Sequence, residues 1–133
     1  MPFQFSTAVR NAAGDTVETT IGTAPTLEIR TGTVPANCAA ADSGTVLSTV
    51  TLPSDWLGAA SGGVKSLAGT WQDASADATG TAGHFRIKQG ATCHIQGSIT
   101  ATGGGGDMTL DNTSLASGQQ FTVTAFSYTV GGA

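Results

Sequence analysis

The alternation of apolar and polar residues predicts strands over most of the chain after residue 24. Leu27 and Ile29, for example, are separated and followed by charged residues, which is typical of a strand with one buried face. Comparable segments recur at residues 46–52, 64–70, 84–88, 93–99, 108–110 and 119–130. Turn-forming residues separate them. The pattern therefore predicts an all-β fold, namely a single-domain antiparallel β-sandwich or jelly roll of about seven to eight strands.

Residues 1–23 fit two interpretations, an N-terminal arm that forms a hairpin of two strands with a turn at residues 13–15, or a short helix. Gly14 argues against a helix, since an interior glycine costs about 1 kcal/mol relative to alanine. Ser6 or Thr7 is suited to cap the start of a helix and Gly22 to end it. The apolar residues recur at every fourth position, as on one helical face: Phe5, Val9, Ala13, Val17 and Ile21. We favour the helix, followed by a β-sandwich over residues 24–133.

The segment 119–130 changes its pattern in the middle. Phe121, Val123 and Ala125 share one face of a strand, whereas the apolar residues from Phe126 onward fall on the other face. Such a switch predicts a β-bulge or a strand buried on both sides. A bulge would let one long strand serve both a core and an interface.

A hairpin is predicted around a turn at residues 89–91. Its inward residues are expected to be Phe85, Ile87, Cys93, Ile95 and Ile99. Its outward residues are expected to be His84, Arg86, Lys88 and His94. This outer face carries two of the five basic residues, so it is a candidate contact for an acidic partner surface. If the histidines take part, attachment should change between about pH 7 and pH 5.5.

Composition narrows the class of protein. More than half of the 133 residues are Gly, Ala, Thr or Ser, only 11% are charged, and the net charge is −4. Low charge with 39% apolar residues does not fit a disordered chain, and the absence of clustered Lys and Arg argues against nucleic-acid binding. No segment predicts a membrane span or a signal peptide, so we expect synthesis in a cytosol. In a reducing compartment Cys38 and Cys93 are expected to be free thiols, with a disulfide as the minor alternative.

No catalytic motif is evident. Residues 58–66 approach a phosphate-binding loop, but Val64 places Lys65 one position out of register. Two histidines alone do not make a metal site, and no serine or cysteine has the spacing of a catalytic triad. We therefore expect no enzyme, no cofactor, no metal and no small-molecule substrate. Trp71 is predicted to lie in the core, whereas Trp56 is either a core residue or an aromatic contact for a partner.

Several segments together resemble a known family. They are residues 27–32 (LEIRTG), 35–37 (PAN), 52–56 (LPSDW), 82–87 (AGHFRI), 107–113 (DMTLDNT) and 117–119 (SGQ). The chain resembles, over nearly its whole length, the capsid cement or decoration proteins of tailed bacteriophages, which are small virion structural proteins. The resemblance implies a jelly-roll-like fold, homodimers in many copies, and binding to the outside of a shell built from a major capsid protein.

These considerations define a first set of contact residues. The candidates for a partner interface are Phe3, Phe5, Trp56, His84, Arg86, Lys88, His94 and Tyr128. The expected location is the capsid exterior of a virion, after synthesis in the host cytoplasm. The alternative is a tail or fibre protein, or a carbohydrate-binding adhesion module in which Trp56 and Tyr128 stack on sugars.

Overall fold

The computed structural model describes residues 3–132, and it is mostly β with one helix. The elements are α1 (Thr7–Ile21), β1 (Thr26–Thr31), β2 (Val46–Thr51), β3 (Val64–Ser66), β4 (Trp71–Asp73), β5 (Gly80–Gln89), β6 (Thr92–Ala101), β7 (Met108–Leu110), β8 (Ser114–Leu115), β9 (Phe121–Val123) and β10 (Ser127–Thr129). The β-rich character predicted from the sequence is confirmed. The described part of the chain has ten strands, more than the seven or eight expected, because several are only two or three residues long.

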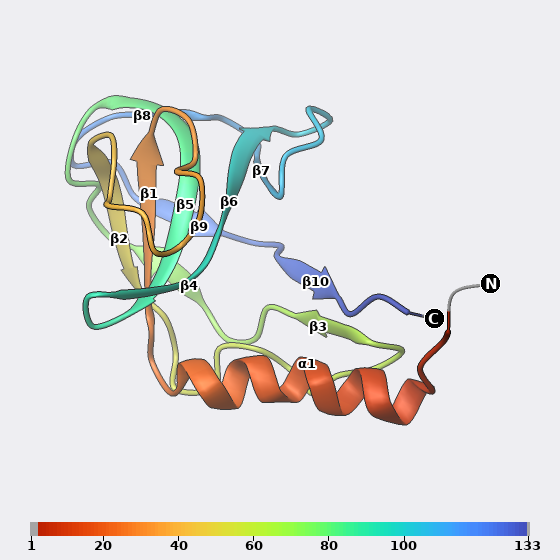
Figure 1. Cartoon of the computed structure of the whole chain (residues 1–133). Helices are drawn as coiled ribbons and strands as arrows, with labels where there is room; N and C mark the ends of the chain where they lie inside the picture. Colours follow the sequence, from red (N-terminus) through yellow and green to blue (C-terminus); the bar gives the residue numbers. More distant parts are fainter. Residues whose placement is uncertain (1–2, 133) are drawn as a thin grey trace.

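The molecule has two parts, which Figure 1 shows side by side. We call β1, β2 and β4–β9 the body, and α1 with β3 and β10 the arm. The arm extends away from the body, and both ends of the described chain lie at its far end (Figure 1). The backbone N–H of Phe5 donates to the carbonyl of Gly132, at 2.7 Å, and thereby joins these two ends.

The strands pair in three groups. The largest sheet has the order β2-β1-β5-β6-β7, with β8 added beside β5, while β4 pairs with β9 and β3 with β10. The ladder between β6 and β7 is parallel and the other ladders are antiparallel. The expectation of a purely antiparallel arrangement is therefore wrong at that one ladder. The glycine-rich segment 102–107 carries the chain back so that β7 runs alongside β6 in the same direction.

The core lies inside the body and is aromatic at its centre. Trp71 packs against Trp56, with ring centroids 6.1 Å apart, and against Phe126, at 5.4 Å. Phe126 also meets Phe85 edge to face. Leu27 and other residues predicted to face inward are fully buried, which confirms that part of the pattern.

Helix α1 confirms the helical interpretation of the N-terminal segment. Ser6 caps it by accepting a hydrogen bond from the backbone N–H of Val9, and Gly22 ends it with a φ of 94°. Gly14 is buried where the helix meets β3, and a Cβ added there would lie 3.1 Å from Cγ of Lys65. The glycine that weakens the helix is thus what allows it to approach the arm's strands.

The predicted strand over 119–130 is two strands. β9 belongs to the body and pairs with β4, whereas β10 belongs to the arm and pairs with β3. The change of face at Ala125 and Phe126 marks the crossing between them rather than a bulge within one ladder. The segment therefore belongs to two sheets, because the chain leaves the β4–β9 pair and enters the β3–β10 pair.

The hairpin of β5 and β6 forms as predicted, with an unexpected register. Ile87 lies opposite Ile95, yet Lys88 lies opposite Cys93, so His94 is an extra residue in the β6 strand. A β-bulge of this kind moves the residues beyond it to the other face. The expectation that Cys93 shares the inward face of Ile95 is therefore wrong, and Cys93 lies on the face of Lys88.

Candidate functional site

The outer face of the β5–β6 hairpin is covered, contrary to the sequence-based expectation. His84, Arg86 and Lys88 are buried, because the segment between β1 and β2 folds over them. We call this segment, residues 32–45, the covering loop. The prediction that these three side chains face outward is wrong, since alternation along a strand says nothing about a loop that returns over its polar face.

Arg86 is the anchor of the covering loop. Its guanidinium donates to the carbonyl oxygens of Asn37 and Ala40, to Oδ1 of Asp42 at 2.7 Å, and to Oε1 of Gln96. A planar guanidinium with five donors is suited to bind several acceptors at once. Arg86 therefore has no donor group left facing solvent for an acidic partner.

Lys88 and Arg30 complete an ion cluster around two carboxylates. Nζ of Lys88 lies 2.6 Å from Oδ2 of Asp42, and Arg30 lies 2.9 Å from Oε1 of Glu28. The hydrogen bond from Lys88, with Arg86 adding to it, lowers the pKa of the Asp42 carboxyl despite partial desolvation. The same bond raises the pKa of Lys88. The cluster is thus charged at neutral pH and ties the covering loop to β1 and β5.

The two histidines are not neighbours. His84 lies opposite Ser98 and is buried, where its Nδ1 donates to the carbonyl of Gly32 and its Nε2 has no hydrogen-bond partner. His94 is exposed and lies beside Thr16, Val17, Thr20 and Ile21 of the helix. The prediction of a shared outer histidine face is wrong, so the proposed pH-sensitive contact loses its geometric basis.

A second ion cluster holds the helix to the arm's strands. Lys65 of β3 is 1% exposed, and its Nζ lies 2.8 Å from Asp15 and 2.8 Å from Glu18 of α1. Desolvation lowers the pKa of Lys65, but the hydrogen bonds to the two carboxylates outweigh it and raise the pKa overall. The bond from Lys65 in turn lowers the pKa of Asp15. The fifth basic residue, Arg10, donates to the carbonyl of Gly62.

Trp56 and Tyr128 are also committed to internal contacts. Trp56 has no exposed surface, and its Nε1 donates to the carbonyl of Gly22 at the end of the helix. Tyr128 is half-buried, and its hydroxyl donates to the carbonyl of Gly14 at 2.6 Å. The structure therefore places Trp56 in the core, where it joins the base of the arm to the body, and leaves it no ring face for stacking.

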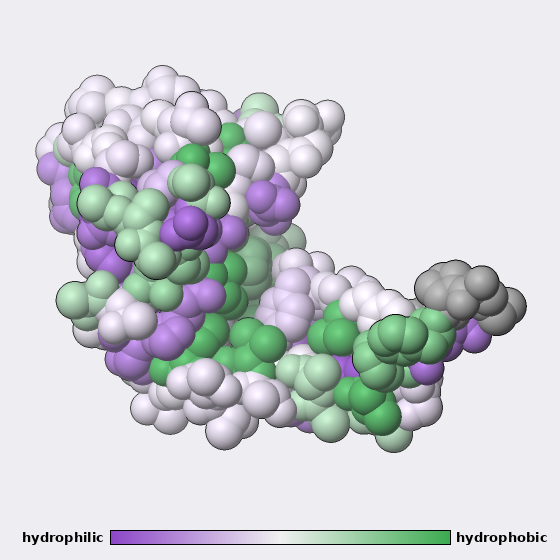
Figure 2. All heavy atoms as spheres, in the orientation of Figure 1, coloured by the Kyte–Doolittle hydropathy of each residue, from purple (hydrophilic) through white to green (hydrophobic). Residues whose placement is uncertain are grey.

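The remaining candidates, Phe3 and Phe5, lie at the far end of the arm. Phe3 is 80% exposed, Phe5 is 45% exposed and Val9 of α1 is 49% exposed, and these are the large apolar side chains exposed within residues 3–132. The rings of Phe3 and Phe5 meet edge to face, with centroids 5.4 Å apart. We call these three residues the arm tip. Figure 2 shows apolar atoms gathered there and a deep notch between arm and body.

The sequence pattern predicts only part of this surface. Phe5 and Val9 were assigned to an apolar helical stripe, and such a stripe normally faces a core. In the structure the second half of this stripe does face the core, since Ile21 is buried and Val17 packs against the core. In the middle of the helix Gly14 faces β3, and ion pairs from Asp15 and Glu18 to Lys65 hold it there. The residues of α1 that contact β3 are polar, namely Asp15 and Glu18. The first half of the apolar stripe, with Phe5 and Val9, therefore has no strand packed over it, and this polar contact is the sequence feature that could have identified the arm tip.

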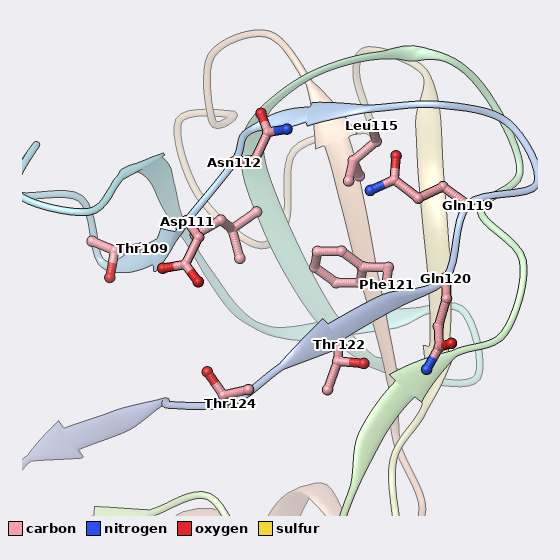
Figure 3. Close-up of a pocket in the computed structure, with 10 residues that line it drawn as sticks. Thr109, Asp111, Asn112, Leu115, Gln119, Gln120, Phe121, Thr122 and Thr124 are labelled. Carbon is pink, nitrogen blue, oxygen red and sulfur yellow. The ribbon is translucent and has the colours of Figure 1, made fainter.

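A small pocket lies on the body between residues 109 and 124. It has a volume of about 200 Å³, and Asp111, Asn112 and Gln119 surround the apolar side chains of Leu115 and Phe121 (Figure 3). Oδ1 of Asn112 accepts from the N–H of Ser114, and Oε1 of Gln119 accepts from the N–H of Ala116. These amides stabilise turns, and the lining has one carboxylate with no histidine, cysteine or basic partner for proton transfer.

Across residues 3–132, no three His, Cys, Asp or Glu side chains gather as metal ligands would. Within the same range, the helix is too short and too polar to cross a bilayer. Comparisons of the chain with protein-family models, with curated proteins and with solved structures found no match. The arm tip is therefore the candidate site that the geometry of this chain itself supports.

Proposed function

We propose that this protein is a structural virion protein that binds the outer surface of a phage capsid and cements neighbouring subunits of the major capsid protein. The observation that carries the proposal is the arm tip, because exposed aromatic side chains on a projecting element mark a contact with another protein. The resemblance of the quoted segments to capsid cement proteins supplies the nature of that partner.

The distribution of charge supports a contact driven by apolar surface. Four of the five basic side chains form ion pairs inside the molecule, so they leave no exposed basic patch for an acidic surface. Each phenylalanine that passes from water into a pocket contributes about 1.5–3 kcal/mol. The arm tip is small compared with the roughly 1,000 Å² that a specific interface needs, so the flanks of the arm must also contact the shell.

Modest affinity at each site is compatible with cementing. Many copies on one shell, each bridging adjacent subunits, add through multivalency, and a ligand that binds only the assembled shell stabilises it. We expect the copies to pair as homodimers and the body to adopt a jelly-roll-like arrangement, both of which the resemblance implies. Light scattering on the purified protein tests the pairing.

The proposal is tested on purified virions of the phage whose genome encodes the chain. The expected result is a copy number comparable with that of the major capsid protein, and particles that lose heat resistance when the gene is deleted. A copy number far below that of the major capsid protein, or unchanged heat resistance after deletion, contradicts the proposal. The adhesion alternative relies on Trp56 and Tyr128. Trp56 is fully buried and Tyr128 is half-buried with its hydroxyl bound to the carbonyl of Gly14, so no observation in the structure favours this alternative.

A further inference from the structure

The two cysteines, 55 positions apart in the chain, meet in the structure. Cys38 lies in the covering loop and Cys93 near the start of β6, and both line one open hollow of about 580 Å³ together with Asp42 and Arg86. Both side chains are free thiols of intermediate exposure. The β-bulge at His94 is what brings Cys93 to this face, where the covering loop lies.

The protein holds the pair in place from both sides. Arg86 binds the carbonyl oxygens of Asn37 and Ala40, which flank Cys38 in the loop. Cys93 is fixed by its pairing with Lys88, which itself binds Asp42 of the same loop. Cys38 is close enough to Cys93 to raise the pKa of the Cys93 thiol, and Sγ of Cys93 lies 3.6 Å from the carbonyl oxygen of Ile95.

We propose that Cys38 and Cys93 form an oxidation site, at which a hydroperoxide converts the two thiols into an intramolecular disulfide that fixes the covering loop to β6. This inference does not depend on the proposed function. It changes the interpretation of the cysteines from separate small apolar residues to a reactive pair.

The order of the two steps follows from the surroundings of the sulfurs. Burial, together with the neighbouring Cys38, raises the pKa of Cys93 to about 12, so Cys93 keeps its proton at neutral pH. We assign the first step to Cys38, the thiol in the covering loop. Its sulfur attacks one peroxide oxygen, the O–O bond breaks, and water leaves with the thiol proton, which gives a sulfenic acid on Cys38.

The second step closes the ring. The sulfur of Cys93 attacks the sulfenic sulfur, the S–O bond breaks, and the oxygen leaves as a second water with the proton of Cys93. Two thiols and one hydrogen peroxide thus give one disulfide and two waters, and the sulfurs supply the two electrons that the peroxide accepts. The positive charge of Arg86 favours the developing thiolate of Cys93 in this step.

The test treats the folded protein with hydrogen peroxide and counts thiols in denaturant. We expect both thiols to disappear together, the intact monomer to lose the mass of two hydrogen atoms, and a non-reducing peptide map to show Cys38 linked to Cys93. A disulfide across a loop of this length should raise the melting temperature by roughly 10 °C, reversibly by a reducing agent.

Cys38→Ser and Cys93→Ser are the matched controls, since each leaves one thiol on the same surface. Neither variant should show the melting shift after oxidation, and Cys93→Ser should accumulate sulfenic or sulfinic acid on Cys38. The proposal is overturned if the wild-type protein keeps two thiols, gains oxygen on separate sulfurs, or links two copies through intermolecular disulfides.

Discussion

The body and the arm are held together by different forces, although both contain paired β-strands. The body surrounds an aromatic and aliphatic core that includes Trp56, Trp71 and Phe126, and the body's ion cluster lies outside that core, under the covering loop. In the arm the charged group takes the central place, because Lys65 lies between helix and strands with Asp15 and Glu18 as its partners.

This difference determines which part of the molecule unfolds at the lower free energy. Burial of apolar area gives a cooperative core that opens only with global unfolding. The carboxylates that bind Lys65 in the arm are partly exposed, so water can replace these contacts when the helix opens locally. The arm should therefore open at a lower free energy than the body. A projecting element that can adjust, attached to a rigid body, suits a protein that has to fit its tip to another surface.

The largest effect is expected from truncation in the body. Trp71→Ala removes a fully buried ring that contacts two other aromatic residues, and it should lower the free energy of unfolding by about 3–5 kcal/mol. Denaturant unfolding followed by circular dichroism measures the loss. A loss below about 1 kcal/mol would show that the aromatic cluster is not the core of the body.

A change in the arm should have a smaller and local effect. Lys65→Met removes both ion pairs to the helix, and we expect amide exchange in α1 to accelerate by roughly tenfold or more, with β5 unaffected. Hydrogen-exchange mass spectrometry resolves the two regions. Equal acceleration in α1 and β5 would contradict the separation into two parts.

The structure also shows where sequence patterns suffice and where they fail. Alternation correctly predicted that Leu27 and Phe85 face the core, because a half-buried strand fixes which side chains meet the core. The turn-forming residues 89–91 correctly placed the turn between β5 and β6. Alternation failed for Arg86, since burial there comes from a loop far along the chain whose carbonyl oxygens satisfy a guanidinium. No local pattern encodes such a tertiary contact.

The prediction of the face on which Cys93 lies was wrong for a related reason. One extra residue in β6 changes the face of every residue beyond it, and His94 carries no sequence signal for a bulge. The helix was predictable from its caps, but its buried face was predictable only in part. Ile21 and Val17 of the apolar stripe do pack on the core, whereas Gly14 and the partners of Lys65 form the contact with β3. The arm tip is exposed as a consequence.

A finer test of the arm concerns one hydrogen bond. Tyr128→Phe keeps the ring but removes the donor to the carbonyl of Gly14, and it should cost about 1 kcal/mol of stability within the arm. Amide exchange in the first half of α1 should increase, while the melting temperature of the body changes little. Unchanged exchange in α1 would mean that this bond does not hold the helix.

The smallest change in stability is expected when the pH is lowered. The folded-state pKa of Asp42 lies below its ordinary value of 3.8, so its contribution to stability is complete above about pH 4 and is lost as the pH falls through the folded pKa. Partial exposure keeps this contribution modest. In melts at decreasing pH, the wild-type protein should lose its advantage over Asp42→Asn below pH 4. A difference that stays constant down to pH 2 would contradict the role of Asp42.

The central claim is that the arm tip attaches the protein to its partner. The most direct measurement is the binding of purified protein to capsids prepared without it, comparing wild type with Phe3→Ser/Phe5→Ser and with the matched control Phe3→Leu/Phe5→Leu. Because these side chains are exposed, the variants should melt like the wild type. We predict that the serine variant binds at least about tenfold more weakly, while the leucine variant keeps most of its affinity. Equal binding by all three proteins would contradict the claim.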